Sequence, residues 1–225
     1  MRGKLEILAM VLGAIGLVGV IAVTALPMWK VTAFIGANLI VMETQWEGLW
    51  MVCVRQADIN MQCKVYDSLL ILPPDVQAAR GLMCVAIILA VLGILVSACG
   101  LRQTIWWQDH GRGKKVTLVA GACLFLVSAL ATLIPVCWTT NTIVRDFYNP
   151  TVLDSRKREI GQALYIGYAT AMVLLVAGVI LIFRCKKGHK VEEEEGGYAP
   201  AMEESKDVMS LKRTPSDYYN MKQYV

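Results

Sequence analysis

The sequence predicts a membrane protein of the α+β class, with four spanning helices and a small antiparallel β-sheet outside the bilayer. The 225 residues are 56% hydrophobic with a mean hydropathy of +0.51, more apolar than ordinary soluble domains. Four apolar runs of about 20 residues are each long enough, as helices, to cross roughly 30 Å of hydrocarbon. Between the first two runs lies a stretch rich in β-branched and aromatic residues, which is typical of strands.

The four apolar runs are predicted to be helices, because only a helix satisfies every backbone polar group within one segment in lipid. Their interiors carry no Asp, Glu, Lys or Arg. Arg2 and Lys4 before the first run also fit a signal peptide, but its apolar core is long for one and three more spans follow. We therefore expect a retained first helix. The predicted spans are residues 7–26, 81–101, 116–136 and 164–183.

Basic residues near the span ends predict the orientation, because cytoplasmic segments carry an excess of Lys and Arg. These residues are dense at the chain start, between spans two and three, and after span four, whereas residues 27–80 contain only four. Arg156, Lys157 and Arg158 favour the opposite orientation, but less strongly. We predict that both termini are cytoplasmic and that the loops at 27–80 and 137–163 lie outside the cell.

The first outer loop contains the stretch QWEGLWMVCVRQADINMQCKVY, in which nine residues separate Cys53 from Cys63. Thiols outside the cell oxidise, and a sheet this small buries little apolar surface, so a disulfide between the two is expected. The alternative is a pair of free or metal-bound thiols, but no histidine lies nearby to complete a zinc site. Strands are predicted at 30–35, 39–43, 49–54 and 62–66.

The second outer loop and the tail contain further candidates. Phe147 and Tyr148 precede an Asn-Pro turn and form either a contact tip or a cap on the sheet. Cys99 and Cys185 lie near cytoplasmic span ends, where palmitoylation and simple burial are both reasonable. Residues 186–225 are acidic and polar, which predicts a disordered tail. Its last residue is Val, and a free carboxylate on an apolar residue suits a PDZ groove.

Composition and motifs exclude several functions. The formal charge of +4 is spread over both sides of the membrane, so nothing indicates nucleic-acid binding. The chain has no Cys-x-x-Cys pair and no Ser/His/Asp set, and its two histidines lie in basic cytoplasmic segments. We therefore expect no enzyme activity, no metal and no cofactor.

The chain resembles the claudins over residues 1–185. The resemblance is carried by a W…GLW…C…C pattern, an arginine entering the second span, an aromatic pair before Asn-Pro, and a Tyr-Val end. The matching residues are Trp29, Gly48, Leu49, Trp50, Cys53, Cys63, Arg80, Phe147, Tyr148, Pro150, Tyr224 and Val225.

The resemblance implies a left-handed four-helix bundle whose sheet takes four strands from the first outer loop and one from the second. It also implies polymerisation at tight junctions of the plasma membrane, side by side in one bilayer and head to head across two cells. Phe147, Tyr148 and Pro150 would make these contacts with copies of the chain and with other claudins. Tyr224 and Val225 would bind PDZ scaffold proteins.

The resemblance further implies that the residue after the second cysteine, here Lys64, sets the charge of a paracellular pore and favours anions, with Arg55 as a second candidate. Lys64 as a solvated strand residue is the alternative. Residues 28–80 contain four basic and five acidic side chains, so selectivity must come from position. The competing function is a claudin-like auxiliary subunit of a receptor or channel, which the compact first loop and the Tyr-Val end disfavour.

Overall fold

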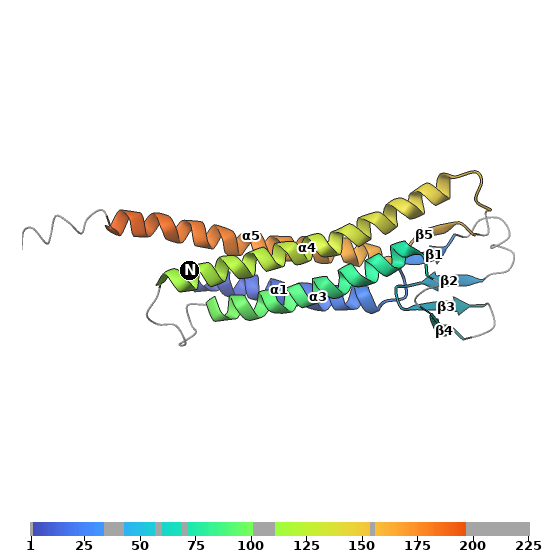
Figure 1. The fold of residues 1–225 in the computed structure, drawn as a ribbon, viewed down its shortest axis with the longest axis horizontal. Coiled ribbons are helices and arrows are strands. Elements are labelled where there is room, and N and C mark those ends of the chain that lie inside the picture. Colours follow the sequence, from blue (N-terminus) through green and yellow to red (C-terminus); the bar gives the residue numbers. More distant parts are fainter. Residues whose placement is uncertain are drawn as a thin grey trace, which may run out of the picture. The chain divides into compact units, whose positions relative to one another are not determined.

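Four helices and a five-stranded sheet make up the part of the chain that the structure describes (Figure 1). The computed structural model describes residues 2–33, 43–56, 60–68, 72–100, 111–153 and 156–196, without the side chains of 2–3, 111–112 and 185–196. The helices are α1 (Arg2–Ala25), α3 (Pro74–Gly100), α4 (Gly111–Tyr148) and α5 (Gln162–Gly196). Met1–Arg184 forms one compact unit and Cys185–Val225 a second, and the contacts below belong to the first.

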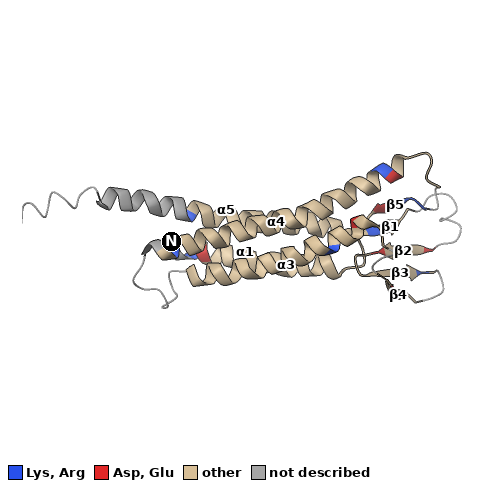
Figure 2. Ribbon diagram, in the orientation of Figure 1, with Lys and Arg blue, Asp and Glu red and all other residues tan. Residues whose placement is uncertain are grey.

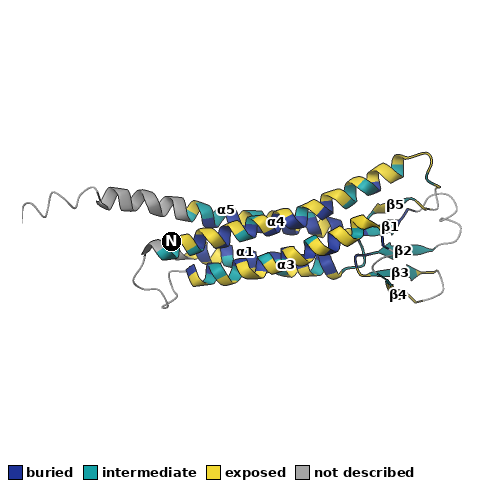
Figure 3. Ribbon diagram, in the orientation of Figure 1, coloured by how far each residue is buried: buried dark blue, intermediate teal, exposed yellow. Residues whose placement is uncertain are grey.

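All four helices are long and apolar enough to cross a membrane, which confirms the predicted multi-pass architecture. Their outward faces are exposed and apolar, as at Ile15, Val18, Leu95 and Leu130, which are 52–66% accessible (Figure 3). In the described residues, charge gathers at the two ends of the bundle and is nearly absent from its middle (Figure 2). Such faces suit lipid as the surrounding solvent.

Small residues let the helices approach closely inside the bundle. Gly13 of α1 lies against the fully buried ring of Phe125 in α4, so that an added Cβ would come within 2.7 Å of the ring. The Ser128 hydroxyl of α4 donates a 2.7 Å hydrogen bond to the Ala86 carbonyl of α3. Without a hydrophobic drive between helices in lipid, close backbone packing and such hydrogen bonds hold a bundle together.

The helices are longer than the predicted spans. The largest difference is in α4, which continues past residue 136 to Tyr148, so about half of the expected second loop is helical. Residues 137–148 contain no Gly or Pro, and the Thr140 and Thr142 hydroxyls donate back to carbonyls one turn earlier. Pro150 ends the helix, because the residue before a proline avoids helical geometry. At the other end, α3 begins at Pro74, a favoured first helical position.

The fourth helix also passes the boundary expected from sequence. α5 continues to Gly196, whereas a disordered tail was expected from residue 186. The segment from 185 to 196 is rich in Lys and Glu, which have good helix propensity, and lacks Pro. The predicted Tyr224 and Val225 end lies outside the described residues, and so does the side chain of Cys185.

The sheet is antiparallel, in the order β4-β3-β2-β1-β5, which confirms the expected combination of helix bundle and small sheet. Four strands come from the first loop and one from the second. They are β1 (Lys30–Thr32), β2 (Thr44–Glu47), β3 (Met51–Arg55), β4 (Gln62–Val65) and β5 (Arg158–Ile160). The second strand differs from the expectation at 39–43, of which 39–42 lie outside the described residues. A tight turn at Gly48 joins β2 to β3, so the partner of β3 must directly precede that glycine.

Candidate functional site

The sheet is attached to the bundle through Trp29. The ring is 2% exposed, and its Nε1 donates a 2.8 Å hydrogen bond to the Val23 carbonyl near the end of α1. Its backbone N–H donates to the Glu47 carbonyl of β2, and its carbonyl accepts from the Gly161 N–H. Gly161 lies against the Met28 carbonyl, where a Cβ would collide. One residue therefore ties α1 to β2 and to the junction of β5 with α5.

The Gly48-Leu49-Trp50 segment is the tight turn between β2 and β3. The Gly48 N–H donates to the Met51 carbonyl at 3.0 Å, and the glycine rests on the backbone of Pro27, leaving no room for a side chain. Leu49 is 3% exposed and faces the bundle, whereas Trp50 is 37% exposed. The glycine of the signature is thus explained by a close backbone approach.

Arg80, at the start of α3, holds this turn in place. Its Nε donates a 2.6 Å hydrogen bond to the Leu49 carbonyl, and its guanidinium lies over the rings of Trp50 and Tyr66 at 4.9 and 5.4 Å from their centroids. Only a planar guanidinium combines this stacking with a directed hydrogen bond, which lysine cannot reproduce. Arg80 is 7% exposed, so aromatic faces and a carbonyl oxygen surround its charge in place of water.

Tyr66 completes the arrangement and was not assigned a role from the sequence. Its hydroxyl donates to the Gly48 carbonyl at 3.3 Å, and its N–H donates to the Trp50 carbonyl at 3.4 Å. Burial raises the pKa of the Tyr66 phenol, and the Glu47 carboxylate raises it further, while Arg80 acts in the opposite direction. The phenol therefore stays neutral and keeps its hydroxyl as a donor. The sequence does contain a signal for this residue, because Tyr66 is an aromatic residue at the end of the predicted strand 62–66, shortly after Cys63.

The predicted disulfide is present between Cys53 of β3 and Cys63 of β4, which lie opposite each other in the sheet. Cys53 is fully buried and pairs on its other side with Trp46 of β2. The described residues contain no group of three or more His, Cys, Asp or Glu that could hold a metal ion. The cysteine pair therefore joins the edge strand β4 to its neighbour β3.

A network around Arg158 joins the strand of the second loop to those of the first. Its guanidinium forms a 2.7 Å ion pair with Glu47 of β2 and donates to the Gln45 side chain at 3.2 Å. A longer bond of 3.4 Å reaches the hydroxyl of Thr32 in β1, the strand between them. Sequence analysis used Arg158 only in the comparison of basic residues, because its partner Glu47 is 111 residues away.

Replacing Arg158 with Gln is expected to destabilise the sheet by about 1 kcal/mol, since the pair is half-buried and the network loses several hydrogen bonds. Thermal unfolding of the purified protein in detergent measures this change. Arg156→Gln, an exposed arginine two residues earlier, is the matched control and should leave the midpoint unchanged. An equal shift for both variants would show that loop charge, rather than the network, stabilises the sheet.

The two pore candidates lie apart. Lys64 is on the edge strand β4, opposite Val52, while Arg55 is the exposed last residue of β3, opposite Thr44 of β2. The Lys64 Nζ forms a 2.7 Å ion pair with the Asp67 carboxylate, and both side chains are more than 70% exposed. Asp67 carried no role in the sequence prediction.

The contact candidates lie where α4 ends. The rings of Phe147 and Tyr148 meet edge to face at 5.6 Å, and the Lys157 ammonium lies 5.9 Å from the Phe147 ring centroid. Tyr148 is 79% exposed, and Pro150 is exposed in the turn that follows. Tyr148 is therefore a projecting tip, while the Phe147 ring is in contact with both Tyr148 and Lys157. Cys99, the candidate for acylation, is exposed near the end of α3.

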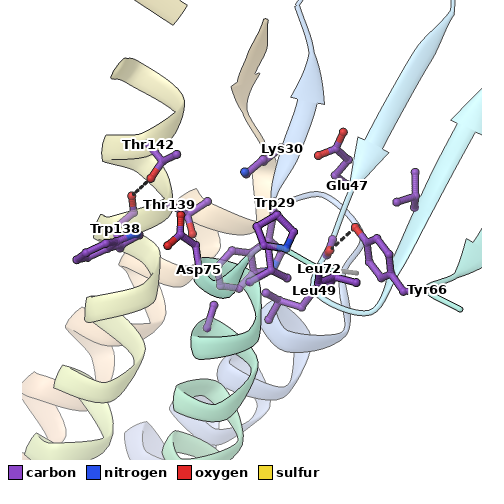
Figure 4. Close-up of a pocket in the computed structure, with 15 residues that line it drawn as sticks. Trp29, Lys30, Glu47, Leu49, Tyr66, Leu72, Asp75, Trp138, Thr139 and Thr142 are labelled. Atoms are coloured by element: carbon purple, nitrogen blue, oxygen red, sulfur yellow. Dashed lines mark hydrogen bonds between the residues drawn. The ribbon is translucent and has the colours of Figure 1, made fainter. Parts of the chain in front are cut away.

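A pocket of about 290 Å³ separates the sheet from α4 beside the Trp29 anchor (Figure 4). Trp138, Thr139 and Thr142 line it from α4, while Lys30 of β1 and Asp75 of α3 border it from the other side. The Trp138 ring is 61% exposed, as suits an aromatic residue at a membrane–water interface. The sheet is thus held at the Trp29 and Arg80 contacts and stands clear of this part of α4.

A buried ion pair at the opposite end of the bundle was also missed. Glu6 of α1 and Arg184 of α5 form a 2.9 Å contact, with side chains that are 8% and 14% exposed. Arg184 also has a buried Nε with no hydrogen-bond partner among the described residues. Both residues lie directly outside the predicted spans 7–26 and 164–183, and the sequence prediction assigned neither of them a partner. The sequence separation of 178 residues gave no signal for the pairing.

Comparison with known proteins identifies the family. The sequence model described as the PMP-22/EMP/MP20/Claudin family matches residues 3–181. The chain is 44% identical to Claudin-8 of Mus musculus over 98% of both chains, and 52% identical to Claudin-3 of Homo sapiens over 83% of this chain and 84% of that one. It is 43% identical to Claudin-17 of Sus scrofa over 95% and 97%, respectively. Claudins are structural proteins rather than enzymes, in agreement with the sequence prediction. The chain belongs to the PMP-22/EMP/MP20/Claudin family.

Proposed function

We propose that the chain polymerises at tight junctions, side by side in one membrane and head to head across two cells, and thereby forms or seals a paracellular passage. The sheet would lie outside the cell and both termini in the cytoplasm, as the distribution of basic residues and the disulfide favour. Other claudins would join the polymer, and PDZ scaffold proteins would bind Tyr224 and Val225.

The observation that carries this proposal is the open edge of the sheet. All four residues of β4 are exposed, and among the described residues this strand ends the sheet on one side. An unpaired strand edge offers a row of backbone donors and acceptors to another chain unless something covers it. Lys64 lies on this edge, so pairing of two copies there would bring its charge to the shared surface.

The tip formed by Phe147 and Tyr148 supports contacts between cells. Tyr148 and Leu153 are 79% and 68% exposed, and α4, which Tyr148 ends, has this end on the side of the bundle that carries the sheet (Figure 1). Aromatic residues contribute most to protein interfaces when a partner removes them from water. The same tip would face the tip of a chain in the opposing membrane.

Freeze-fracture of non-adherent cells expressing the chain tests the proposal. Continuous strands of particles at cell contacts are the expected result, and Tyr148→Ala should reduce their length at least severalfold while surface delivery is kept. Tyr165→Ala removes an exposed tyrosine from α5 and should leave the strands intact. Absence of strands, together with altered currents of a co-expressed channel, would instead support an auxiliary subunit.

A further inference from the structure

We infer that Asp67 determines the ion preference of the paracellular passage by compensating the charge of Lys64. The inference rests on the proposed function and deepens it. The chain would then present a lysine–aspartate pair to a passing ion, in place of the lone lysine that the sequence alone suggests. Its anion preference would be weak until Asp67 is neutralised.

The geometry places both charges against one space. Lys64 Nζ and Asp67 Oδ2 are 2.7 Å apart, and their side chains are 77% and 72% exposed. Both line a shallow pocket of about 180 Å³, together with residues that include Val52, Val65 and Ser68. An ion that approaches this pocket meets the ammonium and the carboxylate together. Lys64 therefore presents its charge there beside that of Asp67.

Screening decides what such an ion experiences. The Debye length is about 8 Å at physiological ionic strength, which is longer than the separation within the pair. At that range the two opposite charges largely cancel and leave only a dipole. Neutralising either partner therefore converts a near-zero field into that of a full unit charge, positive without Asp67 and negative without Lys64.

The exposure of Lys64 and Asp67 also means that either charge can be removed with little effect on stability. An ion pair between two solvated side chains adds little to stability, so removing one partner changes the local field with little effect on the fold. The disulfide at Cys63 and the pairing of β4 with β3 hold the backbone of Lys64 in place independently of the pair. Failure of these variants to reach the cell surface is therefore not expected.

Dilution potentials across an epithelial layer that lacks its own claudins measure the permeability ratio of chloride to sodium. Asp67→Asn is expected to raise this ratio by roughly threefold, and Lys64→Gln to lower it by a similar factor. The double variant Lys64→Gln/Asp67→Asn removes both charges and should return the ratio close to that of the unchanged protein. Asp67→Glu keeps the charge and should preserve the ratio.

Asp75→Asn is the matched control, because it removes one exposed carboxylate from the same loop at the start of α3, away from β4. An unchanged ratio is expected for it, and a rise equal to that of Asp67→Asn would show that net loop charge decides and would overturn the inference. Normal strands with no effect of Asp67→Asn would also overturn it while leaving the proposed function intact. If the unchanged protein formed no strands, both the inference about Asp67 and the proposed function would be refuted.

Discussion

Replacing Arg80 with alanine is expected to detach the Gly48-Leu49-Trp50 turn from the bundle, at a loss of roughly 3 kcal/mol or more of folding free energy. A hydrogen bond from a charged donor contributes about 1.5–3 kcal/mol, and each desolvated cation–π contact about 0.5–2 kcal/mol. Arg80 makes one such bond and two such contacts while it is 7% exposed. Its removal would also leave the Leu49 carbonyl without this donor.

Limited proteolysis of the purified protein in detergent should reveal the detached sheet as faster cleavage within residues 27–80, and the thermal midpoint should fall in parallel. Arg80→Lys retains the charge but neither the planar stacking nor the Nε donor, so it should recover only a minor part of the loss. Arg145→Ala, an exposed arginine of α4, is the control expected to change neither measurement. Full recovery with lysine would refute the stacking argument.

The buried pair of Glu6 and Arg184 gives the second large effect. Removing one partner of a buried pair typically costs about 3–5 kcal/mol, because the other charge stays buried without compensation. We therefore expect Glu6→Ala to lower the thermal midpoint sharply, whereas Lys4→Ala, two residues earlier and exposed, should not.

A double-mutant cycle separates the pair from other effects. The exchange Glu6→Arg/Arg184→Glu restores opposite charges and should recover most of the lost stability, and Glu6→Leu/Arg184→Met should be close to neutral because it removes both charges together. Additive losses in the exchange would show that each residue acts through other neighbours.

Local patterns predicted the helices well, because lipid imposes length and apolarity on any spanning segment. The same patterns failed where long-range geometry decides. The apolar segment at 39–43 has strand propensity, but its residues 39–42 lie outside the described part of the chain. The strand that pairs with β3 is Thr44–Glu47, which the turn at Gly48 places and the local pattern did not predict. α4 passes the expected loop boundary because residues 137–148 contain no Gly or Pro, and Pro135 lies inside the helix without ending it.

The site divides in the same way. The signature residues could be identified from sequence, but not what they touch: Arg80 reaches the Leu49 carbonyl, 31 residues earlier. Asp67 was hidden for a more local reason. In a straight strand, residues three apart point to opposite faces, so only the bend after β4 brings its carboxylate to Lys64.

The connections between helices and sheet differ in length, and this has a mechanical consequence. Only Gly161 separates β5 from α5, and four residues separate α1 from β1. Trp29 is hydrogen-bonded to the Val23 carbonyl of α1 and to the Gly161 N–H. The links from β4 to α3 and from α4 to β5 are longer. If two copies meet head to head as proposed, tension on the sheet would therefore pass into the membrane mainly along α1 and α5. The Glu6–Arg184 pair joins those two helices at the end of the bundle opposite the sheet and would resist their sliding apart under that force.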